Sequence, residues 1–209
     1  MLTNVVFIWY FNQMNEILLN KFSDIFKNDI LPLTVKGVNS GNKIFGAAIL
    51  NKNDYSLVVA ETNNETENPI WHGEIHTLNK FYELDNKMRP NEKNCIFLSS
   101  HEPCSLCLSA ITFSGFNNFY YLFPYEATSD KFNIPHDLNI LKEVFNITDG
   151  KYIKENSYWK SYNINILVNK LKDANRKKLT ESFDEIKKKY IDLSKKYQSS
   201  KEKNSIPLK

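Results

Sequence analysis

Three side chains have the residue types and the spacing of a metal site. His72 stands 32 residues before Cys104, and Cys107 completes a Cys-x-x-Cys pair. One imidazole and two thiolates suit Zn²⁺, and three protein ligands leave the fourth tetrahedral position open for water, as in catalytic rather than closed structural sites. The pattern therefore predicts zinc as the cofactor, with His72, Cys104 and Cys107 as its ligands.

A carboxylate accompanies the predicted ligands. Glu74 follows His72 by two residues, which is about 200° around a helix, so its side chain lies beside the ligand rather than stacked on it. From that position a carboxylate can take a proton from a water that zinc has activated and pass it on, without binding the metal. Glu74 is therefore the predicted general acid and base. His76, four residues after His72, is interpreted as structural or as a residue that supports the ligands, because no His-Glu-x-x-His pattern is present.

The elements that must position these residues can be predicted from apolar spacing and turn residues. A first helix is expected from Asn15 to about Asn28, and another should begin at or near His72. A third should open after Pro103, which suits the first turn of a helix, and end at Gly115. The expected strands are residues 45–50 and 56–60, joined as a hairpin, followed by residues 95–99 and 119–123.

Helices that follow strands in this order indicate an α/β fold, a mixed sheet with helices on both faces. Beyond Leu167 the chain is rich in lysine, and we expect one or two solvated helices there, with residues 198–209 disordered. The predicted domains are residues 13–160, which carry the zinc site, and residues 161–209, a basic helical extension.

Composition limits the partners and the compartment. The net charge of +3 divides into −4 for residues 1–167 and +7 for residues 168–209, so only the extension favours polyanions. Three cysteines, two of them in one pair, argue against a disulfide framework and favour a reducing, cytoplasmic setting. The apolar run Val5–Phe11 is far shorter than the ~20 residues that a membrane span needs, so we interpret it as core or as a disordered end and expect no membrane contact.

The motif residues resemble a known family. His72-Gly73-Glu74 with Pro103-Cys104-Ser105-Leu106-Cys107 is similar to the signature of the cytidine deaminase superfamily of zinc enzymes. The resemblance extends over residues 13–125 and is greatest to the guanine deaminase and tRNA adenosine deaminase branch. Gly73 departs from a usual Ala, and Ile44 from a usual Pro.

The resemblance implies a three-layer cytidine-deaminase-like fold and hydrolytic removal of an exocyclic amino group from a nucleobase, nucleoside or nucleotide. It also implies a homodimer. It places a substrate-binding Asn at the end of the second strand, where Asn63 and Asn64 stand; we favour Asn64. Phe45, Trp71 and His101 are further candidates for substrate contact.

Two alternatives stay open. One is a tRNA adenosine deaminase that edits RNA, for which residues 1–167 offer little positive charge. The other is a non-catalytic binding module stabilised by zinc. A closed structural site would need a fourth protein ligand, for which Cys95 and His101 are the nearby candidates, and it would have no use for Glu74.

Overall fold

The structure is a computed structural model that describes the backbone of residues 2–209 and the side chains of residues 14–209. Its helices are α1 (Leu2–Ile25), α2 (Leu31–Asn39), α3 (Gly73–Glu83), α4 (Ser105–Phe113), α5 (Tyr125–Phe132), α6 (His136–Phe145), α7 (Ile164–Asn169) and α8 (Asp173–Ser200), with a π-helical segment η1 (Phe26–Ile30). Short 3₁₀ turns are η2 (Glu92–Asn94), η3 (Thr148–Gly150) and η4 (Lys201–Lys203). The strands are β1 (Gly46–Asn51), β2 (Leu57–Thr62), β3 (Cys95–His101), β4 (Asn118–Phe123) and β5 (Lys160–Asn163).

The five strands form one mixed sheet in the order β2-β1-β3-β4-β5. β1 is antiparallel to both β2 and β3, whereas β3, β4 and β5 run parallel. Parallel strands need crossover connections, and α4 supplies the one between β3 and β4. Because α4 begins just after β3 ends, the two cysteines follow directly from the centre of the sheet.

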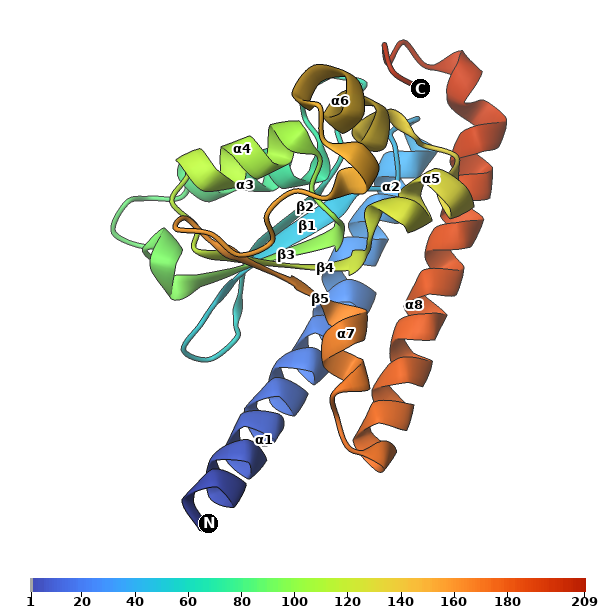
Figure 1. The fold of residues 1–209 in the computed structure, drawn as a ribbon. Helices are drawn as coiled ribbons and strands as arrows, with labels where there is room; N and C mark the ends of the chain where they lie inside the picture. Colours follow the sequence, from blue (N-terminus) through green and yellow to red (C-terminus); the bar gives the residue numbers. More distant parts are fainter. Residues whose placement is uncertain (1) are drawn as a thin grey trace.

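Helices cover both faces of the sheet, as predicted (Figure 1). Successive strand residues point to opposite faces. One face packs with α1, α2 and α8 and contains Ala48, Leu50, Ile96, Leu98 and Leu122. The other packs with α3 and α4 and contains Ala47, Ile49, Phe97, Phe119 and Tyr121. The fold is therefore a three-layer α/β structure with two apolar cores that share the sheet.

The first helix does not end near Asn28, as the sequence suggested. The helical backbone passes through η1 and continues as α2 to Asn39. Pro32 lies in the first turn of α2, directly after η1, and has no backbone N–H to bond to the preceding turn. The wider π turn just before it allows the helical path to continue. The interpretation of Val5–Phe11 as core or disordered end concerns side chains outside the described part.

Residues beyond 160 differ from the solvated extension that the sequence suggested. β5 is an edge strand of the sheet, and α8 runs along the α1 and α2 face with six buried positions at helical spacing: Leu179, Phe183, Ile186, Tyr190, Ser194 and Tyr197. The lysines occupy the remaining face of α8, which explains the polar composition. The disorder expected for residues 198–209 is not observed, since α8 continues to Ser200 and Ile206 is buried. The division into two domains stays a prediction.

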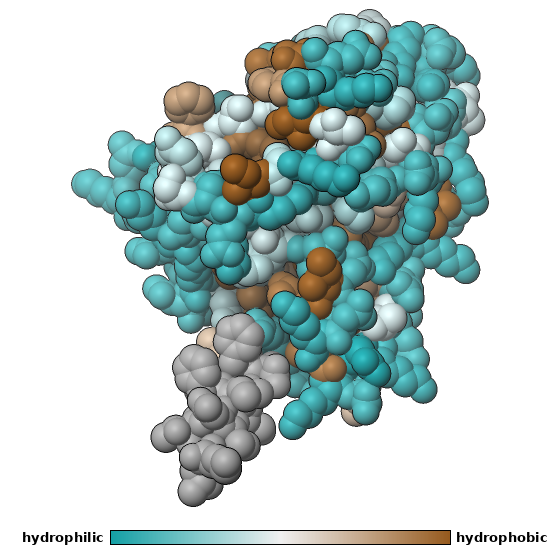
Figure 2. All heavy atoms as spheres, viewed as in Figure 1, coloured by the Kyte–Doolittle hydropathy of each residue, from teal (hydrophilic) through white to brown (hydrophobic). Residues whose placement is uncertain are grey.

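The visible surface is largely hydrophilic, with apolar side chains in small groups (Figure 2). Exposed large apolar residues include Ile70, Leu106, Phe113 and Leu208. Among the described residues, no helix combines the length and apolar character that crossing a bilayer requires.

Candidate metal centre

Two helix starts bring the three predicted ligands together. His72 and Cys104 are the residues that precede the first turns of α3 and α4, both in extended conformation, and Cys107 lies in the first turn of α4. His72 Nδ1 is 3.4 Å from Cys104 Sγ and 3.7 Å from Cys107 Sγ, and the two sulfurs are 3.5 Å apart. The helix starts predicted at these residues are confirmed.

These separations fit a tetrahedral zinc ion. Zn–S bonds of about 2.3 Å and Zn–N bonds of about 2.0 Å at tetrahedral angles place two sulfurs about 3.8 Å apart and a sulfur and a nitrogen about 3.5 Å apart. The ligand atoms of His72, Cys104 and Cys107 all lie within 4.8 Å of one another and are the one such group among the described residues. The three side chains are therefore positioned to bind the metal through Nδ1 and two Sγ atoms.

The electrostatics of the centre favour a thiolate. The contact between the Cys104 and Cys107 sulfurs, together with His72, lowers the pKa of Cys104 despite its burial. Burial acts to lower the pKa of His72, but contact with Cys104 and the charges of Glu65 and Glu74 outweigh it and raise the pKa to about 9. The partial positive charge at the start of α4 acts in the same direction on the sulfurs.

Glu74 is buried beside the ligands without belonging to their group. Its Oε2 accepts a hydrogen bond from Cys107 Sγ at 3.3 Å, and its Oε1 accepts one from Ser99 Oγ at 2.7 Å. Burial, and then the charge of Cys104, raise the pKa of Glu74 against the opposing effect of Ser99. A raised pKa makes it easier for a carboxyl group to take up a proton and hand it on.

Gly73, where the resembled family usually has Ala, is required by a close backbone contact. A Cβ atom at this position would lie 2.8 Å from Gly46 Cα and 2.9 Å from the Phe45 carbonyl oxygen. The start of α3 therefore approaches the start of β1 more closely than an alanine permits. This contact sets His72 and Glu74 against the end of the sheet.

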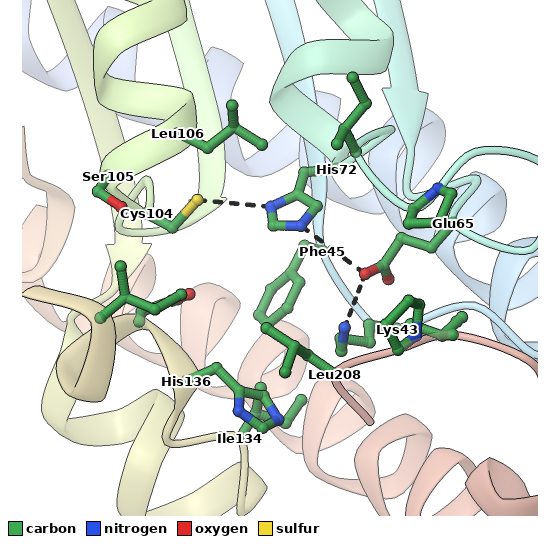
Figure 3. A pocket seen from close by; sticks show the side chains of 16 residues that line it. Lys43, Phe45, Glu65, His72, Cys104, Ser105, Leu106, Ile134, His136 and Leu208 are labelled. Atoms are coloured by element: carbon green, nitrogen blue, oxygen red, sulfur yellow. Dashed lines mark hydrogen bonds and ion pairs between the residues drawn. The ribbon is translucent and has the colours of Figure 1, made fainter. Parts of the chain in front are cut away.

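A cavity of about 240 Å³ opens beside His72 and Cys104 (Figure 3). Its walls are mostly apolar and come from five separate parts of the chain: Phe45, Ile70, Leu106, Ile134, Ile140, Ile206 and Leu208. Polar groups in it are Lys43, Glu65, His136 and Asp137. The pKa of Asp137 is raised well above its usual range by burial and by the charge of Cys104.

The four predicted substrate-binding residues fall into different surroundings. Phe45 lines the cavity, whereas Asn64, Trp71 and His101 do not. Trp71 stacks on His76 with ring centroids 5.5 Å apart. His76 Nδ1 is 2.9 Å from the Thr62 carbonyl oxygen, which agrees with its interpretation as structural.

Asn63 and Asn64 follow β2 and make different contacts. Asn64 is partly exposed and donates to Glu67. Asn63 is buried, and its Oδ1 accepts the backbone N–H of Gly73, directly after His72. The sequence favoured Asn64, but the structure places Asn63 at the metal centre.

His101 is buried among aromatic rings, and its Nδ1 is 2.9 Å from Ser100 Oγ. Phe45, Phe123, Phe132 and Tyr190 surround it with centroid distances of 4.6 to 5.5 Å. Burial lowers its pKa to about 3. It is a core residue, and Cys95 is one as well: its Sγ donates to the Asn91 carbonyl oxygen, and burial raises its pKa to about 11. Neither belongs to the metal-ligand group.

Several residues of the cavity gave no usable signal in the sequence. Lys43, Glu65 and Asp137 are single charged residues in loops or at a helix start, without a motif around them. His136 is the first residue of α6, and its Nε2 is 3.0 Å from the Lys209 backbone oxygen.

The site and the three-layer fold together define an α/β domain with the ligand set of a zinc centre. Residues 29–123 match the family described as "Cytidine and deoxycytidylate deaminase zinc-binding region". The superfamily predicted from the His72 and Cys104 motifs is confirmed, and zinc is its cofactor. No curated protein matches the chain in sequence.

Similar solved structures include a guanine deaminase from Bacillus subtilis, with 24% identity, 64% of this chain and 80% of that chain covered, and a TM-score of 0.47. A guanine deaminase from Nitrosomonas europaea has 20% identity, covers 73% and 80% of the two chains, and gives a TM-score of 0.44. A structure from a study of A-to-I editing by tRNA:A34 deaminases has 20% identity, covers 46% and 70%, and gives 0.36.

Proposed function

We propose that this chain is a zinc-dependent hydrolase that removes the exocyclic amino group of a nucleobase-type ring, with a free base, nucleoside or nucleotide as substrate. The observation that carries the proposal is the burial of Glu74 beside the ligand Cys107, with Ser99 holding its second oxygen. A zinc site that served stability alone would not need an additional buried carboxylate, whose burial costs free energy.

The proposed division of labour follows from the side chains. Zinc held by His72, Cys104 and Cys107 supplies Lewis acidity toward water. Glu74 carries the protons: one of its carboxylate oxygens takes a proton from the water whose oxygen bonds to the ring carbon, and passes it to the adjacent ring nitrogen. It then moves the proton of the added hydroxyl to the amino group, so that the C–N bond breaks and a carbonyl and ammonia form. The bond from Ser99 fixes one oxygen of Glu74, so the other is directed toward the ligands.

The cavity suits one planar ring. Apolar contacts from Phe45, Leu106 and Ile134 can flank the faces of a heterocycle, and the few polar groups can fix its orientation. The raised pKa of Asp137 favours its neutral form, which can donate as well as accept a hydrogen bond. We propose Asp137 as a contact to polar atoms on the edge of the ring.

The size of the cavity favours a small substrate over RNA. Its volume of about 240 Å³ lies below the roughly 300–1,000 Å³ typical of ligand pockets. Ile206, Pro207 and Leu208 form part of its wall, where a polynucleotide would need space for its neighbouring nucleotides. Editing of tRNA is the alternative outcome, for which the sequence resemblance is the reason to test.

The test is ammonia release by the zinc-loaded protein from a panel of bases, nucleosides, nucleotides and tRNA. Glu74→Gln should retain zinc while turnover falls by roughly 10²–10⁴-fold, because shape is kept and the proton carrier is lost. Glu83→Gln, at an exposed position of α3 paired with Lys80, is the matched control and should keep wild-type turnover.

Three outcomes would count against the proposal. Wild-type turnover by Glu74→Gln would remove Glu74 from the mechanism. A zinc-loaded protein inactive on the whole panel would favour the non-catalytic module. Turnover of tRNA alone, with binding that weakens steeply as salt increases, would favour the editing enzyme. The predicted homodimer is tested separately by the molar mass from size-exclusion chromatography with light scattering.

A further inference from the structure

A buried ion pair lies against the metal centre on the side away from the sulfurs. Lys43 Nζ donates to Glu65 Oε1 at 2.7 Å, and the two side chains are only 6% and 1% exposed. The same Glu65 oxygen is 3.7 Å from His72 Nε2. Figure 3 shows Glu65 between the imidazole of His72 and the ammonium group of Lys43.

The second oxygen of Glu65 is also held. Asn63 Nδ2 donates to Oε2 at 2.6 Å, and Asn63 Oδ1 accepts the N–H of Gly73. Asn63 therefore ties Glu65 to the first residue of α3, next to His72. Both oxygens of the carboxylate have a donor, so its orientation toward the imidazole is fixed from two sides.

The geometry of His72 assigns different tasks to its two nitrogens. Nδ1 faces the sulfurs of Cys104 and Cys107, so it is the nitrogen that would bind zinc. A metal-binding imidazole is neutral and carries its remaining hydrogen on the other nitrogen. That hydrogen, on Nε2, points toward Glu65.

We propose that Glu65 is a positioning residue of the metal centre, which accepts the Nε2–H of His72 and so fixes the ring for metal binding, with Lys43 neutralising its charge. A carboxylate in contact with a metal-binding histidine orients the ring and makes the nitrogen ligand more basic. A rotation of the imidazole that shortens the 3.7 Å separation to hydrogen-bond length completes the contact.

Stability alone is a poor reason for this arrangement. A buried ion pair gains little over apolar side chains of similar volume because both charges lose their hydration. The pair is built from loops at residues 43 and 65, which the fold brings together only at the metal centre. Its position beside His72 is therefore the feature that needs a function.

The first test compares Glu65→Gln with Glu67→Gln. Glu67 is exposed in the same loop and bonded only to Asn64 among the described side chains, so its variant is the matched control. Zinc affinity, measured by competition with a chelator, should fall roughly 10- to 100-fold in Glu65→Gln and stay unchanged in Glu67→Gln. The visible spectrum of the Co²⁺-loaded protein should also change in Glu65→Gln alone.

The second test separates positioning from stability. Lys43→Met leaves a buried carboxylate without its partner, so its thermal midpoint should fall, and Lys43→Met with Glu65→Gln should recover much of that loss because no charge remains. The double variant should nevertheless bind zinc as weakly as Glu65→Gln. Wild-type zinc affinity in either variant that lacks Glu65 would overturn the proposal.

The inference rests on the ligand set of the proposed function but not on its substrate. Weak zinc binding by Glu65→Gln in a protein that deaminates nothing would support the positioning role and reject the deaminase. Wild-type zinc binding by Glu65→Gln in an active deaminase would do the reverse. The two proposals can therefore fail independently.

Discussion

The two faces of the sheet differ in how they are built. The α3 and α4 face carries the metal ligands at two helix starts, so its chemistry depends on short segments of chain. The opposite face is assembled from α1, α2 and α8, which lie at the two ends of the sequence. The spacing of residues in short segments therefore specifies the metal site. The opposite face of the sheet depends on packing between distant segments, and the many lysines of α8 make that packing hard to predict from sequence.

The largest expected effect comes from removing α8. A chain that ends after Leu167 loses the apolar side chains that cover one face of the sheet, among them Phe183 and Ile186. Each such side chain stabilises a core by roughly 3–5 kcal/mol, and a whole domain has only about 5–15 kcal/mol. We therefore expect the shortened chain to be unfolded, as measured by circular dichroism and by its failure to retain zinc.

A point substitution makes the same comparison without shortening the chain. Phe183→Ala should lower the free energy of unfolding by about 3–5 kcal/mol, and Lys188→Ala, at an exposed position of the same helix, by less than about 0.5 kcal/mol. Urea titration gives both values. If the shortened chain folded and bound zinc, α8 would be the dispensable extension that the sequence suggested.

Loss of one ligand tests the other face. Cys104→Ser should reduce zinc content from about one ion per chain to nearly none, because a sulfur of the ligand group is lost. Cys95→Ala, which removes a buried sulfur outside that group, should keep its zinc. Metal analysis of the purified variants decides between them, and the reverse result would transfer the ligand role to Cys95.

The site residues that could be predicted from sequence are those whose spacing along the chain is fixed by one helix. His72, Cys104 and Glu74 could be assigned because their spacing is fixed within or next to single helices. Glu65 could not, since its role depends on a loop that meets Lys43 only in three dimensions.

Two other elements escaped prediction for different reasons. β5 has only four residues, with an alternation too short to distinguish it from a loop. α8 has a narrow apolar stripe among many lysines, and its burial depends on a sheet face built from other segments.

A pH experiment examines the place where the two faces meet. His101 ends β3 and touches Tyr190 of α8, and burial lowers its pKa to about 3. The unfolded chain takes up a proton near pH 6.5, whereas the folded one does not until about pH 3. The contribution of His101 to the free energy of unfolding is therefore complete above pH 6.5. It is lost as the pH falls from about 6.5 to about 3.

The full difference corresponds to about 5 kcal/mol. His101→Phe should remove this contribution, because a phenyl ring has no nitrogen that can bind a proton. Urea titrations at several pH values should show a smaller acid destabilisation in the variant than in the wild type. If the free energy of unfolding fell equally with decreasing pH in the two proteins, His101 would not be held neutral by its aromatic neighbours.

The smallest expected effect lies where residues from the α8 side reach the metal centre. Leu208 lines the cavity and is about half exposed, so further burial of its side chain against a substrate stabilises the complex by about 1 kcal/mol. Leu208→Ala should therefore raise KM about five-fold with little change in kcat, since its side chain lies in the cavity wall and has no group that can move a proton. Lys203→Ala, exposed in η4, is the control. A fall in kcat without a change in KM would instead mean that Leu208 acts on the chemical step. The chain that follows α8 would then contribute to catalysis as well as to the cavity wall.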